Sequence, residues 1–325
     1  PADNTCGLTV CEAAAPHLRL AKTWRADGCE PYGTARTVNL YPAALDGLDA
    51  LHRLLARLAA RPRCCVLRGA IADPARARGV RRLLHDDHAT GERATLREAA
   101  RRWVALDVDG LPLPEGTDPR ALPACARAAL PHLPPAFRVA RCVIQATASH
   151  GIKPGARLRL WFWLDRPTRG AELATWLAGA PVDASAFRPA QPIYTAAPLF
   201  EGRRDPLPAR LALLDGAEPA VRVPPAALLT PTPPPRPPRP RAADDAAGAR
   251  ALAWARARIA AQREGARHDT ALRVAGWLAA LARRGEVAPA AVVRAVAEGI
   301  ADAGKPRAEG ERIAAFALAK EGLAR

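Results

Sequence analysis

The chain has 325 residues, 49% of them hydrophobic, so it can bury one large core or two moderate ones. Its 48 Lys and Arg residues exceed its 32 Asp and Glu residues along the whole chain, which suggests a polyanionic partner such as nucleic acid, unless GC-rich coding alone made it Arg-rich. No apolar run could span a membrane and no signal-peptide pattern is present, so we expect a cytoplasmic protein with no membrane partner.

The seven cysteines include no Cys-x-x-Cys pair, so reduced thiols are the expectation. Cys6, Cys11 and Cys29 could together form a zinc site, but their spacing matches no common zinc knuckle. No structural zinc is therefore expected.

The first 230 residues contain short apolar or aromatic runs of strand length, bounded by Gly and Pro. These runs are residues 64–71, 103–110, 142–149 and 157–165. Helical patterns lie among them, at 45–61 and 172–179. The alternation predicts a core of the α+β or α/β class with a mixed sheet.

Residues 103–110, "WVALDVDG", place two aspartates at the end of an apolar run. Strand alternation directs Asp107 and Asp109 to the same face. Two carboxylates on one face repel each other unless a cation lies between them, and Mg²⁺ or Mn²⁺ is a natural occupant in nucleotidyl transfer. Two solvated loop aspartates are the plain structural alternative.

A haloacid-dehalogenase-like phosphatase is a further alternative, with Asp107 as nucleophile and Asp109 as acid. That chemistry also needs a downstream lysine and a second acidic pair at the end of another apolar strand. The adjacent acidic pairs of this chain are 86–87 and 244–245, and neither follows an apolar strand. The phosphatase interpretation is therefore disfavoured.

Residues 146–167 are predicted to form a strand, a Gly-rich turn and a second strand. Backbone amides near the two glycines could hold triphosphate oxygens together with polar side chains around the turn. These side chains are Ser149, His150, Lys153, Arg157 and Arg159. An ordinary hairpin with a solvated basic tip remains the alternative.

The segment 231–244 begins with "PTPPPRPPRPR", in which seven of eleven residues are proline, and it predicts a semi-rigid spacer. Beyond it, residues 245–325 predict only helices, at 247–262, 269–285, 288–304 and 309–323. The predicted organisation is thus a first domain over 1–230, a proline-rich linker over 231–244 and a small helical bundle over 245–325. The helical domain is either a structural appendage or a basic module that grips nucleic acid.

Three stretches together resemble the catalytic domain of archaeo-eukaryotic primases, in the primase-polymerase branch of plasmids, phages and integrated elements. They are "ALDVDG", "TASHGIKPGARLRLWFWLDRP" and "PVDASAFRPAQPIYTAAP", and the resemblance covers residues 60 to 230. The family has an Asp-x-Asp/Glu motif, a small-x-His motif and an apolar-Asp motif. The resemblance implies an α+β primase core followed by a helical domain that binds template or the initiating nucleotide.

Carried over residue by residue, the resemblance gives Asp107, Asp109 and Asp183 as catalytic residues that hold two divalent metals, Mg²⁺ or Mn²⁺. Asp165, which ends the aromatic strand, is the other candidate for the third carboxylate, but we expect it to cap a turn or the following helix. Nucleotide binding is assigned to Ser149, His150, Lys153 and Arg159. Relatives often have histidine where this chain has Arg159, so either that arginine or His150 fills the role.

The function expected from the resemblance is a DNA primase-polymerase of a mobile element. Its partners would be a single-stranded DNA template, dNTP or NTP, and a replicative helicase in the same or a separate chain. The sequence begins without methionine and contains none, as a piece of a longer primase-helicase would. A replication initiator that binds single-stranded DNA without synthesis is the runner-up.

Overall fold

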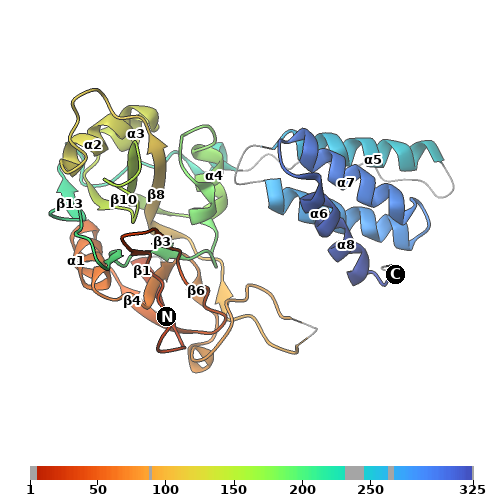
Figure 1. The fold of residues 1–325 in the computed structure, drawn as a ribbon, viewed down its shortest axis with the longest axis horizontal. Coiled ribbons are helices and arrows are strands. Elements are labelled where there is room, and N and C mark those ends of the chain that lie inside the picture. Colours follow the sequence, from red (N-terminus) through yellow and green to blue (C-terminus); the bar gives the residue numbers. More distant parts are fainter. Residues whose placement is uncertain (1–5, 88–89, 231–244, 263–266, 324–325) are drawn as a thin grey trace. The chain divides into compact units, whose positions relative to one another are not determined.

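The computed structural model describes residues 6–87, 90–230, 245–262 and 267–323. The chain divides into two compact units, Pro1–Pro231 and Thr232–Arg325, and Figure 1 labels many of their helices and strands. The predicted spacer at 231–244 lies outside the described residues. Among the helices of the described ranges, none is long and apolar enough to cross a membrane.

Two four-stranded sheets dominate the first unit, which has the mixed α+β structure that the sequence predicts. The first sheet has the order β11-β5-β1-β4, with strands β1 (Gly7–Ala13), β4 (Val38–Ala44), β5 (Cys64–Leu67) and β11 (Ile193–Tyr194). The second has the order β13-β9-β10-β8, with strands β8 (Arg101–Leu111), β9 (Cys142–Ala146), β10 (Ala156–Thr168) and β13 (Leu211–Leu214). Neighbouring strands are antiparallel in both sheets, so the mixed sheet that the sequence predicts does not form the core. Among the described strands, a parallel pair occurs in a small sheet, between β2 (Thr23–Trp24) and β12 (Leu199–Phe200).

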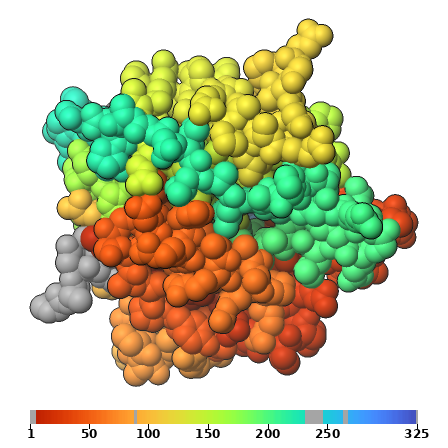
Figure 2. Space-filling model, turned by 90° about the vertical axis from the view of Figure 1, so that its left-hand side faces the viewer, coloured from red at the N-terminus to blue at the C-terminus, as the bar shows by residue number. Residues whose placement is uncertain are grey.

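Smaller elements complete the first unit. Short strands form the sheet β12-β2-β3, with β2 (Thr23–Trp24), β3 (Cys29–Glu30) and β12 (Leu199–Phe200), and the pair β6 (Ala70–Ile71) and β7 (Leu96–Arg97). The α-helices are α1 (Leu48–Ala59), α2 (Leu122–Ala129), α3 (Pro135–Arg138) and α4 (Gly170–Trp176). In Figure 2, the N-terminal segments, red to orange, occupy the lower half of the visible face, and residues from the middle of the chain, yellow to green, lie above them.

The two faces of the β8–β10 sheet pack against different layers. On one face, Phe162 of β10 lies edge-on to Phe137 of α3, with ring centroids 5.1 Å apart. On the other face, Trp103 and Trp161 are 5.7 Å apart, and Trp103 Nε1 donates a hydrogen bond to Gly7 O of β1 at 3.0 Å. This second face is therefore turned toward the first sheet.

The predicted strand 64–71 is broken in the structure into β5 and β6, because Arg68 is buried between them. Its Nη1 and Nη2 donate to Trp103 O at 2.6 Å and Thr168 O at 2.9 Å. Its own carbonyl accepts from Arg101 Nε at 2.7 Å. Burial lowers the pKa of the Arg68 guanidinium to about 9. Arg68 thus ties β5 to both long strands of the second sheet.

The other strand predictions hold, with shifted ends. Predicted strand 103–110 corresponds to β8, 157–165 to β10, and 142–149 to β9, which ends at Ala146 where the turn begins. The sequence analysis missed β1 and β4. Pro42 within β4 conceals that strand, and the structure tolerates this proline because β4 lies at the edge of its sheet.

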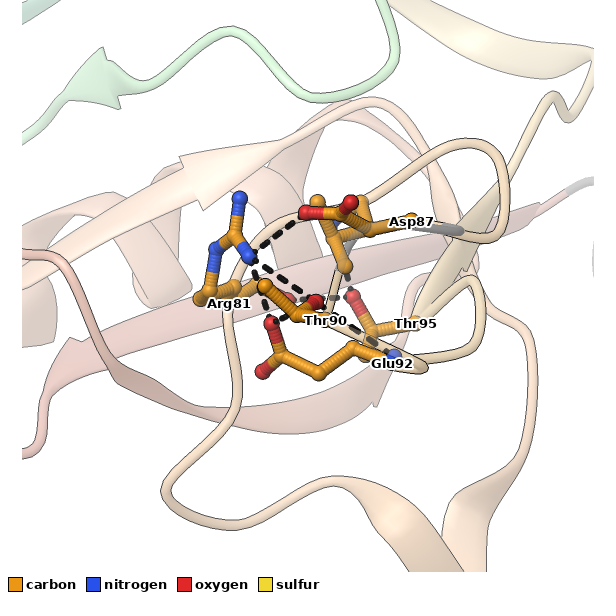
Figure 3. A network of polar contacts seen from close by, with 6 residues as sticks. Arg81, Asp87, Thr90, Glu92 and Thr95 are labelled. Atoms are coloured by element: carbon orange, nitrogen blue, oxygen red, sulfur yellow. Dashed lines mark hydrogen bonds and ion pairs between the residues drawn. The ribbon is translucent and has the colours of Figure 1, made fainter.

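The acidic pair 86–87 lies in a loop held by polar contacts, shown in Figure 3. Arg81 Nη1 donates to Asp87 Oδ2 at 2.8 Å and to Glu92 Oε2 at 2.5 Å. Thr95 Oγ1 donates to Arg81 O, and Asp86 Oδ1 accepts from the amide of Ala94. Both acids therefore organise a loop instead of following an apolar strand, as a phosphatase pair would.

The second unit contains four helices, α5 (Asp245–Ala260), α6 (Arg267–Arg283), α7 (Pro289–Asp302) and α8 (Arg307–Lys320), close to the predicted spans. They share one buried core that is rich in alanine. A Cβ added to Gly310 would lie 2.6 Å from Ala297 Cα, and one added to Gly299 would lie 2.9 Å from Ile259 Cβ. The small residues therefore allow helices to approach closely.

Candidate functional site

A pocket of about 390 Å³ opens in the first unit where β8, β10 and the turn after β9 meet. Seven residues were assigned to catalysis or nucleotide binding from the sequence, and all of them except His150 line this pocket. The lining residues are Lys22, Tyr32, Asp107, Asp109, Thr147, Ala148, Ser149, Lys153, Arg157, Arg159, Asp183, Ser185, Ala186, Gln191, Pro192, Ile193 and Tyr194.

Strand register places each aspartate of β8 directly opposite an arginine of β10. Asp107 pairs with Arg159 and Asp109 with Arg157 in the antiparallel ladder. Arg159 Nη2 donates to Asp107 Oδ2 at 2.5 Å, and Arg157 Nη1 donates to Asp109 Oδ1. The pocket therefore has two ion pairs side by side on one sheet face.

The two ion pairs differ in exposure. The side chains of Arg159 and Asp107 are 9% and 24% exposed, whereas those of Arg157 and Asp109 are 20% and 71% exposed. Arg159 is also fixed by its Nη1, which donates to Tyr194 O at 2.5 Å. Its buried Nε has no hydrogen-bond partner among the described residues. The pair of Arg159 and Asp107, the inner pair, is thus part of the pocket wall. The pair of Arg157 and Asp109, the outer pair, faces solvent.

These arginines correct one step of the sequence argument. The repulsion between Asp107 and Asp109 implied a cation, and a metal was the occupant considered. In the structure the guanidinium groups of β10 supply that positive charge. Crowding of the two carboxylates alone is therefore no argument for a metal.

Asp183, which the resemblance assigns as the third carboxylate, lies beside Asp107. It begins the 3₁₀-helix η4 (Ala184–Phe187), and its backbone N–H donates to Asp107 O at 3.1 Å. Its carboxylate accepts from Ser185 N at 2.8 Å and from Ser185 Oγ at 2.7 Å. Asp183 lines the pocket, and its two carboxylate oxygens hold the start of η4.

Asp165, the other candidate for the third carboxylate, does not line the pocket. It lies six residues beyond Arg159 on β10, which is about 20 Å along an extended strand. Its Oδ1 accepts from Val223 N at 3.0 Å. The predicted cap on α4 is provided instead by Glu172, whose Oε2 accepts from Arg169 N at 2.7 Å.

The turn after β9 brings Ser149 and Lys153 to the pocket. The carbonyl of Ser149 accepts from Ile152 N at 3.2 Å and from Lys153 N at 3.0 Å, so it closes the turn. Gly155 has a φ of +79°, and a Cβ there would lie 2.8 Å from Leu111 O. Only glycine therefore allows β10 to begin so close to the end of β8.

His150 holds this turn from inside the protein and does not line the pocket. Its Nδ1 accepts from Arg157 N at 3.2 Å, and its Nε2 lies 2.8 Å from Pro119 O, to which only a protonated nitrogen can donate. The partners thus require the neutral Nε2–H tautomer, and burial lowers the pKa of the ring. His150 positions the turn, whereas the sequence analysis placed it among nucleotide ligands; Arg159 is the one of the two in the pocket.

One wall of the pocket comes from residues that the sequence analysis missed. The rings of Tyr32 and Tyr194 stack with centroids 3.9 Å apart and planes 5° from parallel. Lys22 Nζ lies 5.1 Å from the centroid of the Tyr32 ring. Burial raises the pKa of the Tyr32 phenol to about 12. Tyr194 falls within a quoted stretch of the resemblance, but no pattern marks Lys22 or Tyr32.

The donor set of the pocket suits a hard divalent cation, because carboxylate oxygens are the preferred ligands of Mg²⁺ and Mn²⁺. Among the described residues, Asp107 Oδ1 and Asp109 Oδ2 accept no hydrogen bond, so each aspartate keeps one oxygen for a ligand. Over the same residues, no three His, Cys, Asp or Glu side chains form a ready metal-binding group, including Cys6, Cys11 and Cys29. The two aspartates of β8 are thus the residues that fit a cation.

Comparison with known proteins gives one result that concerns primases. No protein-family model matches the chain, and no curated protein matches its sequence. The crystal structure of primase RepB' is similar over 98% of this chain and 95% of that chain, with 14% sequence identity and a TM-score of 0.27. A TM-score this low is no basis for assigning fold or function.

Proposed function

We propose that the chain is a nucleotidyltransferase of the primase-polymerase kind, which joins nucleoside triphosphates on a single-stranded DNA template. The observation that supports this most is the pocket itself, in which two aspartates on one strand face two arginines on the next. A triphosphate needs fixed positive charge, and phosphoryl transfer needs carboxylates near the reacting phosphate. The pocket has both within one cavity.

The basic side chains would bind the triphosphate. Arg157 and Arg159 offer planar guanidinium groups that match phosphate oxygens, and Lys153 is exposed on the turn. The stacked tyrosines, with Lys22 against them, provide an aromatic surface of the kind that bases pack on.

The expected reaction is attack of a 3′-hydroxyl, or of an initiating nucleotide, on the α-phosphate of the incoming nucleotide, with loss of pyrophosphate. Asp107 and Asp109, with Asp183 beside them, would hold Mg²⁺ or Mn²⁺. When bound, such ions activate the attacking oxygen and neutralise charge on the leaving pyrophosphate. The chain's own contribution is to orient the triphosphate against these carboxylates.

The wider assignments follow from the same proposal. The net charge of +16 suits a nucleic-acid partner, and the helical unit would contribute grip on the template or on the initiating nucleotide. A replicative helicase, in the same or a separate chain, would be the partner at a fork. Single-stranded DNA and dNTP or NTP are the substrates to test first.

A second candidate function is a replication initiator that binds nucleotide or single-stranded DNA without synthesis. One observation favours it: both aspartates of β8 are already neutralised by arginines. In a site that only binds nucleotide or DNA, Asp107 and Asp109 would stay paired with these arginines.

Nucleotide incorporation on primed and unprimed single-stranded templates, with Mg²⁺ or Mn²⁺, separates the two functions. The chain should extend a primer, and Asp107→Ala with Asp109→Ala together should abolish extension while single-stranded DNA binding and the circular dichroism spectrum are kept. Undiminished extension by the double variant would refute the assignment of these aspartates. No incorporation by the unmodified chain, with DNA binding intact, would favour the initiator.

A further inference from the structure

The charges on the pocket face of β8 and β10 cancel in pairs. Each carboxylate of β8 is bound by the guanidinium directly opposite on β10. A triphosphate that enters alone meets arginines already bound to carboxylates, and it lies close to two negative charges. A divalent cation that enters alone meets carboxylates already bound, and it lies close to two positive charges. Each ligand by itself therefore pays an electrostatic cost.

We infer that the ion pairs exchange partners when substrate binds, so that Arg157 and Arg159 turn to the triphosphate while Asp107 and Asp109 turn to the divalent cation. This rests on the proposed function and adds how its arginines and aspartates change partners. Each ligand breaks the pairs that the other must break, so the two bind with positive coupling. Reciprocal coupling of this kind between sites typically amounts to about 5- to 150-fold in affinity.

The outer pair is the one that can exchange most freely. The Asp109 side chain is 71% exposed, so water can solvate its carboxylate while Arg157 moves. Besides its bond to Asp109, the Arg157 guanidinium makes one hydrogen bond among the described residues, from Nε to Pro154 O at 3.2 Å. Arg159 is instead tied to Tyr194 O and buried. The outer pair is therefore where substitutions can test exchange with least effect on the wall.

The inference predicts opposite signs for the two partners and for the two ligands. Arg157→Gln leaves Asp109 without its counter-charge, so affinity for the cation should rise and affinity for the triphosphate should fall. Asp109→Asn releases Arg157, so affinity for the triphosphate should rise and affinity for the cation should fall. A merely structural ion pair would move neither affinity in this pattern.

The experiment measures each ligand without the other, because triphosphates also bind divalent cations in solution. Mn²⁺ alone is titrated and followed by the electron paramagnetic resonance signal of free Mn²⁺. Inorganic tripolyphosphate alone, with a chelator present, is titrated by calorimetry. Each affinity should change about 5-fold or more in the stated direction, the low end of coupling between sites.

The matched control is the ion pair of Arg141 and Asp49, which lies outside the pocket. Its side chains are 28% and 59% exposed, close to the values of the outer pair. Arg141→Gln and Asp49→Asn make the same charge changes and should alter neither affinity. Equal shifts in the control variants would attribute the effect to net charge and overturn the inference.

Shifts of the same sign for both ligands in Arg157→Gln, or no shift in folded variants, would also overturn it. Synthesis is not part of this test, so the two proposals fail separately. If the affinities change with opposite signs but no nucleotide is incorporated, the exchange of ion-pair partners is supported and the polymerase function is refuted. If nucleotide is incorporated but the affinities do not change with opposite signs, the polymerase function is supported and the exchange of ion-pair partners is refuted.

Discussion

Both ends of strand β10 carry charged residues, but these residues bind different partners at the two ends. At the pocket end, Arg157 and Arg159 bind carboxylates across the sheet, and these pairs face a cavity. At the far end, Asp165 accepts from Val223 N, and Arg166 donates to Pro224 O at 2.7 Å. At the far end these side chains hold the backbone of a later segment, whereas at the pocket end each carboxylate binds a guanidinium group beside a cavity that a ligand can enter.

The difference follows from where the neighbouring strand ends. β9 runs only from Cys142 to Ala146, so on that side the first residues of β10 border the turn, while on the other side Arg157 pairs with Asp109 of β8. At the far end, the chain returns beside β10, and Val221 O accepts from Asp165 N at 3.1 Å. The side of β10 that β9 leaves is thus occupied at the pocket end by the turn with Ser149 and Lys153, and at the far end by the returning chain.

The largest expected effect is on Asp183, at the pocket end. Asp183→Asn removes the negative charge but keeps an oxygen that can accept from Ser185 N, so the fold should be retained. Nucleotide incorporation should fall on the order of 100-fold, as when a group that stabilises transition-state charge is lost. Ser185→Ala, which keeps the carboxylate, is the control and should lose less activity. Equal losses in both variants would show that the turn matters and the charge does not.

An intermediate effect, on stability, is expected at His150. His150→Asn keeps an acceptor for Arg157 N but loses the donor to Pro119 O, which should cost about 1–3 kcal/mol in free energy of unfolding at pH 7.5. Since burial lowers the pKa of the folded ring, the unfolded chain binds the proton first as pH falls. The stability from the neutral ring is therefore present above about pH 6.5 and lost below it.

Urea unfolding of both proteins at pH 7.5 and 5.5 measures this. The gap between the original chain and His150→Asn should narrow at the lower pH. A gap of the same size at both pH values would contradict a buried neutral histidine.

The smallest expected effect is at the far end of β10. Asp165→Ala removes one hydrogen bond to Val223 N and should cost about 0.5–1.5 kcal/mol in free energy of unfolding. Thermal unfolding measures the loss, and nucleotide incorporation at a temperature where the variant is folded should be unchanged. An inactive but stable Asp165→Ala would reverse the contrast between the two ends.

The sequence predicted the strands that form the pocket, but it did not predict which residues of β8 and β10 lie opposite each other. Alternation along β8 and β10 was enough to place Asp107 with Asp109 on one face. It does not give register, because many alignments of two strands satisfy the same alternation. The pairing of each aspartate with an arginine, and hence the source of counter-charge, therefore required the structure.

The rest of the site could not be predicted because it depends on contacts between distant segments. Tyr32 reaches the pocket by stacking on Tyr194, which lies far along the chain. His150 was assigned to nucleotide binding because it lies in the Gly-rich turn and because the resembled family has a histidine motif, yet in the structure its ring faces Pro119 O. The proline-rich spacer lies outside the described residues and stays a prediction.

The strand order of the first sheet determines where the chain can be truncated without loss of the pocket. The quoted motifs start after residue 60, so a boundary drawn from them would keep every aspartate and arginine of the pocket. Such a truncation would remove β1, which pairs with β5, and β4, which pairs with β1, together with Lys22 and Tyr32. A fragment chosen by its motifs alone would thus possess the reactive groups and lack the wall against which they work.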